Sequence, residues 1–115
     1  MNAESVAGVI VIVEDPFITK FLHSALSRAG ESAISLSPKS AMEFMDAAKT
    51  PVRALITNTP QMFRPHAGQF PLIYTSSCPV PEAVDGFPVN RTVRKPFHAA
   101  QVLDAIHEVC IVGLR

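Results

Sequence analysis

The chain has 115 residues, of which 48% are hydrophobic and 17% charged, a balance typical of one folded globular domain and not of a disordered segment. Ten basic side chains offset ten acidic ones and no basic run occurs, so direct binding of nucleic acid is not expected. The longest apolar run near the start, Val9–Val13, is far too short to span a membrane. Cys78 and Cys110 do not have the spacing of metal ligands, so they are predicted to be reduced thiols of a cytoplasmic protein.

The first predicted element is a buried strand over Gly8–Val13, a nearly continuous run of β-branched residues. A helix follows it and stops at Gly30, because glycine is common just beyond helix ends. Apolar residues recur along this helix at spacings of three and four, and are expected to form its buried face: Phe17, Phe21, Leu22, Ala25, Leu26 and Ala29.

A short second strand is predicted at Ala33–Leu36. Ser37 and Pro38 are the residue types of an N-cap and a first-turn proline, so a second helix should begin there. Its expected inward face consists of Ala41, Phe44, Met45 and Ala48. A third strand, Ala54–Thr57, then leads into Asn58.

The fourth and fifth strands are expected at Leu72–Thr75 and, more weakly, at Thr92–Arg94. The segments before and after the fourth strand, residues 58–71 and 76–90, are rich in proline, which interrupts helices. The first segment is therefore predicted to lack a full helix. The second leaves room for only about one or two turns around Glu82–Asp85.

The last predicted element is a helix over His98–Val112. Its inward residues are expected to be Val102, Leu103, Ile106, Val109 and Cys110. Strands and helices thus alternate along one domain, residues 1–115, which predicts an α/β fold with a doubly wound parallel sheet of five strands. In this fold the third helix would be lost and the fourth shortened.

Polar side chains follow four of the predicted strands. They are Glu14 and Asp15 after the first strand, Asn58 after the third, Thr75, Ser76 and Ser77 at the end of the fourth, and Lys95 after the fifth. Because the carboxyl ends of parallel strands meet at one edge of a sheet, these side chains should lie together. This edge is the predicted functional site.

Four segments of the sequence resemble the receiver domain of bacterial two-component response regulators. They are VIVEDPF, LITN, LIYTSS and VRKPF, of which the last, continued as VRKPFHAAQVLDAI, is the most specific. They follow the family's order over nearly the whole chain, apart from residues 59–70 and 78–90. The resemblance implies a flavodoxin/CheY-like fold.

In that family an acidic pair holds magnesium, an aspartate accepts phosphate from a histidine kinase, and a hydroxyl and a lysine contact the phosphoryl group. The matching positions here are Glu14 and Asp15 for the acidic pair, Ser76 or, one step earlier, Thr75 for the hydroxyl, and Lys95 for the lysine. The resemblance also implies a cis peptide bond before Pro96. The phosphate-accepting position falls on Asn58.

Several departures from the family pattern predict a degenerate receiver. The amide of Asn58 cannot form the acyl phosphate that a carboxylate forms, because its nitrogen lone pair is delocalised into the carbonyl. With one carboxylate fewer, magnesium should bind weakly or not at all. The family's aromatic switch position is occupied by Thr92, and Pro16 and Pro60 are shifted from the family's usual proline positions.

The residues of the acidic pair also have simpler interpretations. Asp15 followed by Pro16 is a good N-cap and first-turn pair, so Asp15 is expected to start a helix, with or without a role in a pocket. Glu14 would then be either a pocket residue or a solvated charge at the end of a strand. Lys95 is expected to form a fixed ion pair with Glu14 or Asp15 in place of a phosphate-dependent contact.

The favoured function is a phosphorylation-independent pseudo-receiver: a protein-interaction and regulatory module of two-component signalling, without cofactor or enzymatic activity. One alternative is an ordinary phospho-accepting receiver in which Asn58 replaces an aspartate. Another is a small enzyme on the same fold. The expected partner is a protein, either a histidine kinase or another signalling domain, or a second copy of the chain, and not a membrane or a nucleic acid.

Two surfaces are candidates for binding a partner. The first lies around the fifth strand and is expected to include Arg91, Arg94, His98 and Gln101. The second is the part of the sheet left without a third helix. Four residues are available to cover that gap: Met62, Phe63, Phe70 and Phe87. If they cover it, the chain can stay monomeric; if not, a homodimer through the gap is expected.

Overall fold

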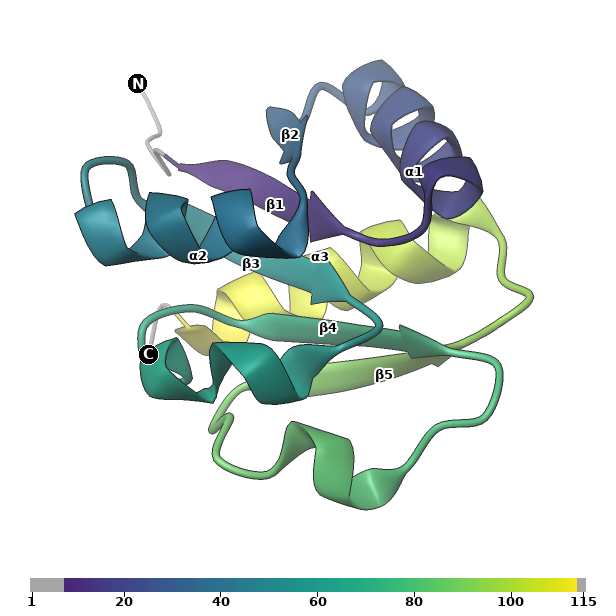
Figure 1. Ribbon diagram of the computed structural model, residues 1–115. Coiled ribbons are helices and arrows are strands. Elements are labelled where there is room, and N and C mark those ends of the chain that lie inside the picture. The colour runs from purple at the N-terminus through teal and green to yellow at the C-terminus, as the bar shows by residue number, and fades with distance from the viewer. Residues whose placement is uncertain (1–7, 114–115) are drawn as a thin grey trace.

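The five predicted strands are all present in the structure, a computed structural model that describes residues 8–113. They are β1 (Val9–Val13), β2 (Ala33–Ser35), β3 (Val52–Thr57), β4 (Leu72–Ser76) and β5 (Asn90–Arg94). All pair in parallel in the order β2-β1-β3-β4-β5 (Figure 1). The doubly wound sheet is therefore confirmed. The predicted domain also includes residues 1–7 and 114–115, which lie outside the described range.

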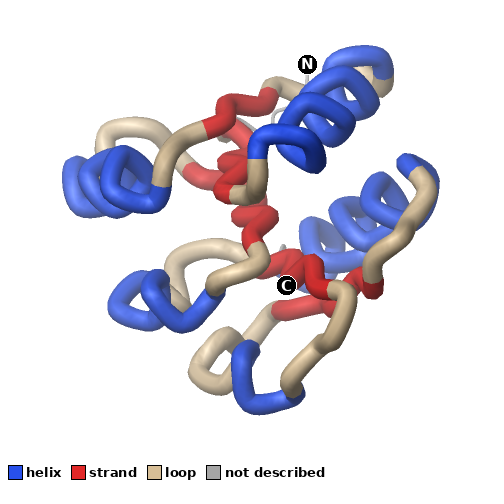
Figure 2. Tube along the Cα trace, turned by 45° about the vertical axis from the view of Figure 1, so that its right-hand side comes forward, coloured by secondary structure: helices blue, strands red, loops and turns tan. Residues whose placement is uncertain are grey.

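Helical segments cover both faces of this sheet. The α-helices of the described range are α1 (Pro16–Arg28), α2 (Pro38–Ala47) and α3 (Ala99–Gly113), and its 3-10 helices are η1 (Pro60–His66) and η2 (Pro81–Val84). Figure 2 shows α1 and α3 on one face of the sheet and α2, η1 and η2 on the other. The third helix is thus replaced by η1 and the fourth by the single turn η2, as the prolines predicted.

The ends of the first two helices follow from local sequence. The Asp15 carboxylate accepts a hydrogen bond of 2.9 Å from the Ile18 N–H, and the Ser37 hydroxyl accepts one of 3.1 Å from the Ser40 N–H. Both predicted N-caps are confirmed. Gly30 follows the last turn of α1 with φ +81°, a left-handed conformation that glycine adopts without steric cost.

The predicted buried face of α1 is partly wrong. Leu22, Ala25 and Leu26 are buried, whereas Phe17 and Phe21 are 83% and 39% exposed. The stripe that faces the sheet begins one residue later, at the half-buried Ile18, so both phenylalanines lie beside it. Ala29 and Ala48 are also exposed, because each lies just beyond the end of its helix and forms its C-cap.

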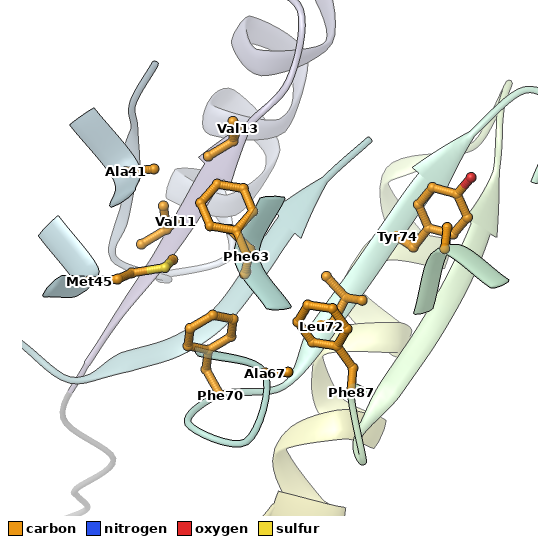
Figure 3. Packing of buried hydrophobic residues seen from close by; sticks show 12 residues of the cluster. Val11, Val13, Ala41, Met45, Phe63, Ala67, Phe70, Leu72, Tyr74 and Phe87 are labelled. Carbon is orange, nitrogen blue, oxygen red and sulfur yellow. The ribbon is translucent and has the colours of Figure 1, made fainter. Parts of the chain in front are cut away.

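The two segments that replace the third and fourth helices cover this face of the sheet with aromatic side chains. Phe63, Phe70 and Phe87 are buried in one cluster with Val11, Val13, Leu55, Leu72 and Met45 (Figure 3). Met62, predicted to share in this cover, is 38% exposed instead, because it precedes the inward Phe63 on a short helix. His66 ties η1 to α2, with its Nε2 2.7 Å from Asp46 Oδ1.

The opposite face of the sheet is covered by α1 and α3. Val102, Ile106 and Val109 of α3 are buried as predicted, while Leu103 and Cys110 are half-buried against the same cluster. Cys78 and Cys110 are both free thiols. No helix in residues 8–113 combines the length and the apolar character needed to cross a membrane.

Candidate functional site at the carboxyl edge of the sheet

The strand register brings the predicted site residues to one edge. Val13 pairs with Thr57, so Glu14 and Asn58 leave neighbouring strands at the same level. Ser76 of β4 pairs with Arg94 of the edge strand β5. The Lys95 N–H donates a hydrogen bond of 2.9 Å to the Ser76 carbonyl. The order of the strands changes direction between β1 and β3, which is the position where α/β sheets of this kind form their crevice.

Glu14 is the centre of the site, and its side chain is 0% exposed. Its carboxylate lies 3.0 Å (Oε2) and 3.1 Å (Oε1) from Lys95 Nζ, and it accepts hydrogen bonds from the Thr75 hydroxyl and, at 3.0 Å, from the Asp15 N–H. The interpretation of Glu14 as a solvated strand-end charge is therefore wrong. The predicted ion pair with Lys95 is present, with the Glu14 side chain buried and the Lys95 side chain 18% exposed.

Thr75 and Ser76, the two candidates for the hydroxyl, have different surroundings. Thr75 is fully buried and donates to Glu14, so its hydroxyl belongs to the site. Ser76 accepts a hydrogen bond of 3.1 Å from the Cys78 N–H and closes the turn after β4. The earlier of the two positions is the one that faces the site, because successive side chains of a strand point to opposite sides.

Asn58 lies apart from this group of contacts and is exposed. The backbone around it is shaped by Thr57, a residue that the sequence analysis did not single out. The buried Thr57 hydroxyl accepts a hydrogen bond of 3.1 Å from the Thr59 N–H, a local turn that threonine and serine often stabilise. In the sequence, this turn could have been recognised from Thr57 at the end of the third strand, two residues before the polar Thr59.

Two further expectations concern the neighbouring strand β5. The peptide bond between Lys95 and Pro96 is cis, as the resemblance implied. Thr92 is exposed on β5, opposite the buried Tyr74 of β4. The Tyr74 hydroxyl accepts a hydrogen bond of 3.3 Å from the Val80 N–H, so the aromatic ring paired with Thr92 is held in the fold by the loop after β4.

The residues present at this edge do not fit a divalent cation. The Glu14 carboxylate already faces an ammonium and two further donors. Asp15 uses Oδ1 to cap α1, and its Oδ2 lies 3.9 Å from Lys95 Nζ. Asn58 adds only a neutral amide. Among the described residues, no group of three or more His, Cys, Asp or Glu side chains has the arrangement of a metal site.

We therefore expect magnesium to bind with a Kd on the order of 1 mM or weaker, because hard cations need several free carboxylate oxygens. Calorimetry and amide chemical shifts of residues 14, 15 and 95 measure this directly. The Asn58→Asp variant adds one carboxylate and should bind more tightly than the parent chain. Stoichiometric binding of magnesium by the parent at micromolar concentration would contradict the expectation.

Comparison by sequence finds no counterpart: no family model and no curated protein matches the chain. Comparison by structure finds receiver domains. A signal receiver domain of an HD domain-containing protein from Pseudomonas fluorescens Pf-5 matches with a TM-score of 0.78 and 16% identity, over 97% of this chain and 94% of that one. A response regulator receiver protein from Sinorhizobium medicae WSM419 matches with a TM-score of 0.73 and 20% identity, over 93% and 98% of the two chains.

The chemotaxis response regulator CheY4 of Vibrio cholerae is also similar, with a TM-score of 0.72 and 15% identity, over 91% of this chain and 99% of that one. Each of these matches spans nearly the whole of both chains. At such low identities they establish the fold: the chain has the CheY-like architecture with strand order β2-β1-β3-β4-β5.

Proposed function

We propose that this chain is a pseudo-receiver, a protein-interaction module of bacterial two-component signalling that works in the cytoplasm without phosphorylation and without enzymatic activity. The observation that carries the proposal is the closed contact between Glu14, Thr75 and Lys95. Thr75 and Lys95, the hydroxyl and the ammonium that would contact a phosphoryl group in the family, both bind the Glu14 carboxylate instead. The acceptor position holds the amide of Asn58, which cannot become an acyl phosphate.

A domain of this kind acts through a surface that is permanently formed, because it has no ligand-driven equilibrium between two states. Contacts between η1 and η2 support such a fixed surface. Arg64 of η1 donates hydrogen bonds of 2.9 Å to the Glu82 carbonyl and 3.2 Å to the Asp85 carbonyl. These bonds fix the segment that replaces the fourth helix.

The surface around the edge strand β5 remains our candidate for a protein partner, such as a histidine kinase or another signalling domain. Arg94, His98 and Gln101 are exposed there, and Arg91 forms an ion pair with Glu108 of α3. The second candidate, a homodimer through the gap of the third helix, is less favoured. The buried Phe63 and Phe70 cover that part of the sheet.

Phosphorylation by acetyl phosphate tests the proposal. The parent chain, incubated with labelled acetyl phosphate and magnesium, is expected to carry no hydroxylamine-sensitive phosphate, and Asn58→Asp should be labelled to only a small extent because Lys95 and Thr75 stay bound to Glu14. Hydroxylamine-sensitive label on the parent would overturn the proposal. Stoichiometric labelling of Asn58→Asp alone would favour the alternative of an ordinary receiver whose aspartate is replaced.

A further inference from the structure

A pocket of about 240 Å³ opens at the amino-terminal edge of the sheet, opposite the edge that holds Glu14. Its walls are the end of α2, the loop from α2 to β3, and residues 69–70, which precede β4. In a doubly wound fold with all its helices, the third helix would continue over this part of the sheet, whereas η1 ends at His66. The pocket is a space that this shortened segment leaves unfilled.

The floor of the pocket is apolar and its rim is polar. Met45 and Phe70 line it from below; they are 4% and 6% exposed and belong to the core cluster on this face of the sheet (Figure 3). Thr50 and Gln69 are exposed at the rim. An apolar interior with a few polar groups around it is the usual composition of a site for a small organic ligand.

Both walls of the pocket are fixed by hydrogen bonds. On one side, the Pro51 carbonyl accepts a bond of 3.0 Å from the Val9 N–H of β1. On the other side, the Gln69 N–H donates one of 2.9 Å to the His66 carbonyl. The His66 ring joins this second wall to α2, with Nδ1 3.2 Å from Gln69 Oε1 and Nε2 2.7 Å from Asp46 Oδ1. A pocket that is formed in advance loses less entropy when a ligand binds.

The backbone at the end of α2 is strained where it lines the pocket. Ala48 adopts the left-handed conformation, with φ 51° and ψ 32°. Glycine is the usual residue at such a helix end, because the Cβ of an L residue in this conformation lies too close to the backbone. Residues other than glycine that are held in strained conformations cluster at functional sites.

The charge of the pocket comes from Lys49, the ionisable residue of its lining. Lys49 has no ion-pair partner among residues 8–113, and the nearby carboxylate of Asp46 faces His66 instead. The carbonyl end of α2 contributes about half a negative charge, which the full charge of the ammonium outweighs. The pocket therefore favours an anionic ligand over a cationic one.

We propose that this pocket binds a small aromatic carboxylate, with its ring on Met45 and Phe70 and its carboxylate beside Lys49. An engineered apolar cavity of about 150 Å³ holds benzene, so a pocket of about 240 Å³ has room for two fused rings. The Thr50 hydroxyl and the Gln69 amide nitrogen provide further hydrogen-bond donors at the rim. The pocket is separate from the carboxyl edge and from the β5 surface, so the inference does not depend on the proposed function.

Other ligands fit this pocket less well. A divalent cation needs carboxylate oxygens, and none of the described aspartates and glutamates lines the pocket. A nucleotide adds a sugar and a phosphate to its base, which together exceed the space. An aromatic side chain of a protein partner would fill the apolar floor but would bring no counter-charge to Lys49.

The test uses 2-naphthoate and its cationic counterpart, 2-naphthylmethylamine, as probes. In a titration of the labelled full chain, 2-naphthoate should bind with a Kd of about 1 mM and shift the amides of residues 48–50 and 69–70 together with the methyl group of Met45. Residues 14, 75 and 95 at the opposite edge should not shift. The cation should bind about fivefold more weakly than the carboxylate.

The variant Lys49→Met should keep the fold, since Lys49 is exposed, and should weaken binding of 2-naphthoate about threefold without weakening that of the amine. Lys39→Met is the matched control, because Lys39 is exposed on the first turn of α2, away from the pocket, and should leave binding unchanged. Equal binding of the two probes, shifts centred on another part of the chain, or unchanged affinity in Lys49→Met would overturn the proposal. So would the absence of a Met45 shift at about ten times the expected Kd.

Discussion

Replacing Lys95 with methionine is expected to lower the free energy of unfolding by about 3–5 kcal/mol at neutral pH. Methionine keeps the apolar length of the side chain and removes its charge. The Glu14 carboxylate, which is 0% exposed, would keep the Thr75 hydroxyl and the Asp15 N–H but lose its counter-charge. A buried charge without a partner is costly because no water replaces the lost contact. Urea denaturation of parent and variant measures the difference.

Two further variants distinguish the loss of the ion pair from a general effect of replacing lysine with methionine. The double variant Glu14→Gln with Lys95→Met removes both charges and leaves a neutral amide that Thr75 can still bind, so it should be more stable than Lys95→Met alone. Lys20→Met is the matched control, since Lys20 is exposed, and it should change stability by less than about 0.5 kcal/mol. A loss of under about 1 kcal/mol in Lys95→Met would show that Glu14 does not depend on this pair.

Much of the fold could be predicted because its signals are local. The run of β-branched residues marked β1, and the pairs Asp15–Pro16 and Ser37–Pro38 marked the starts of α1 and α2. The prolines in residues 58–71 showed that no full helix follows β3. These signals act over a few residues, so they can be read without knowing what packs against them.

The features that could not be predicted depend on distant contacts. The ion pair of Glu14 with Lys95 was expected from the order of the strands, but the full burial of the Glu14 side chain and its hydrogen bond from Thr75, 61 positions away, could not be inferred from its neighbours in sequence. The link from Arg64 to the carbonyls of Glu82 and Asp85 was missed for the same reason. The periodicity of α1 permits two adjacent apolar stripes, and only packing shows that the one with Phe17 faces solvent.

The second large effect is expected at Phe63. Replacing it with alanine should lower the free energy of unfolding by about 3–5 kcal/mol, because the ring is 0% exposed and its removal leaves a cavity in the core. The effect should be large here because η1 is a short 3-10 helix of seven residues with Pro65 inside it. Such a segment has little stability of its own and is held by what it buries. Urea denaturation measures the loss.

Met62 provides the matched control, since it precedes Phe63 on the same segment and is 38% exposed. Met62→Ala should cost less than about 1 kcal/mol, and Phe63→Leu, which retains most of the volume, should fall between the two alanine variants. If Met62→Ala and Phe63→Ala were equally destabilising, the segment would be held by its backbone and not by the aromatic side chain. If the stability losses follow the predicted order, Phe63 covers the apolar face of the sheet in place of the third helix. This part of the sheet is then not free to bind a second copy of the chain.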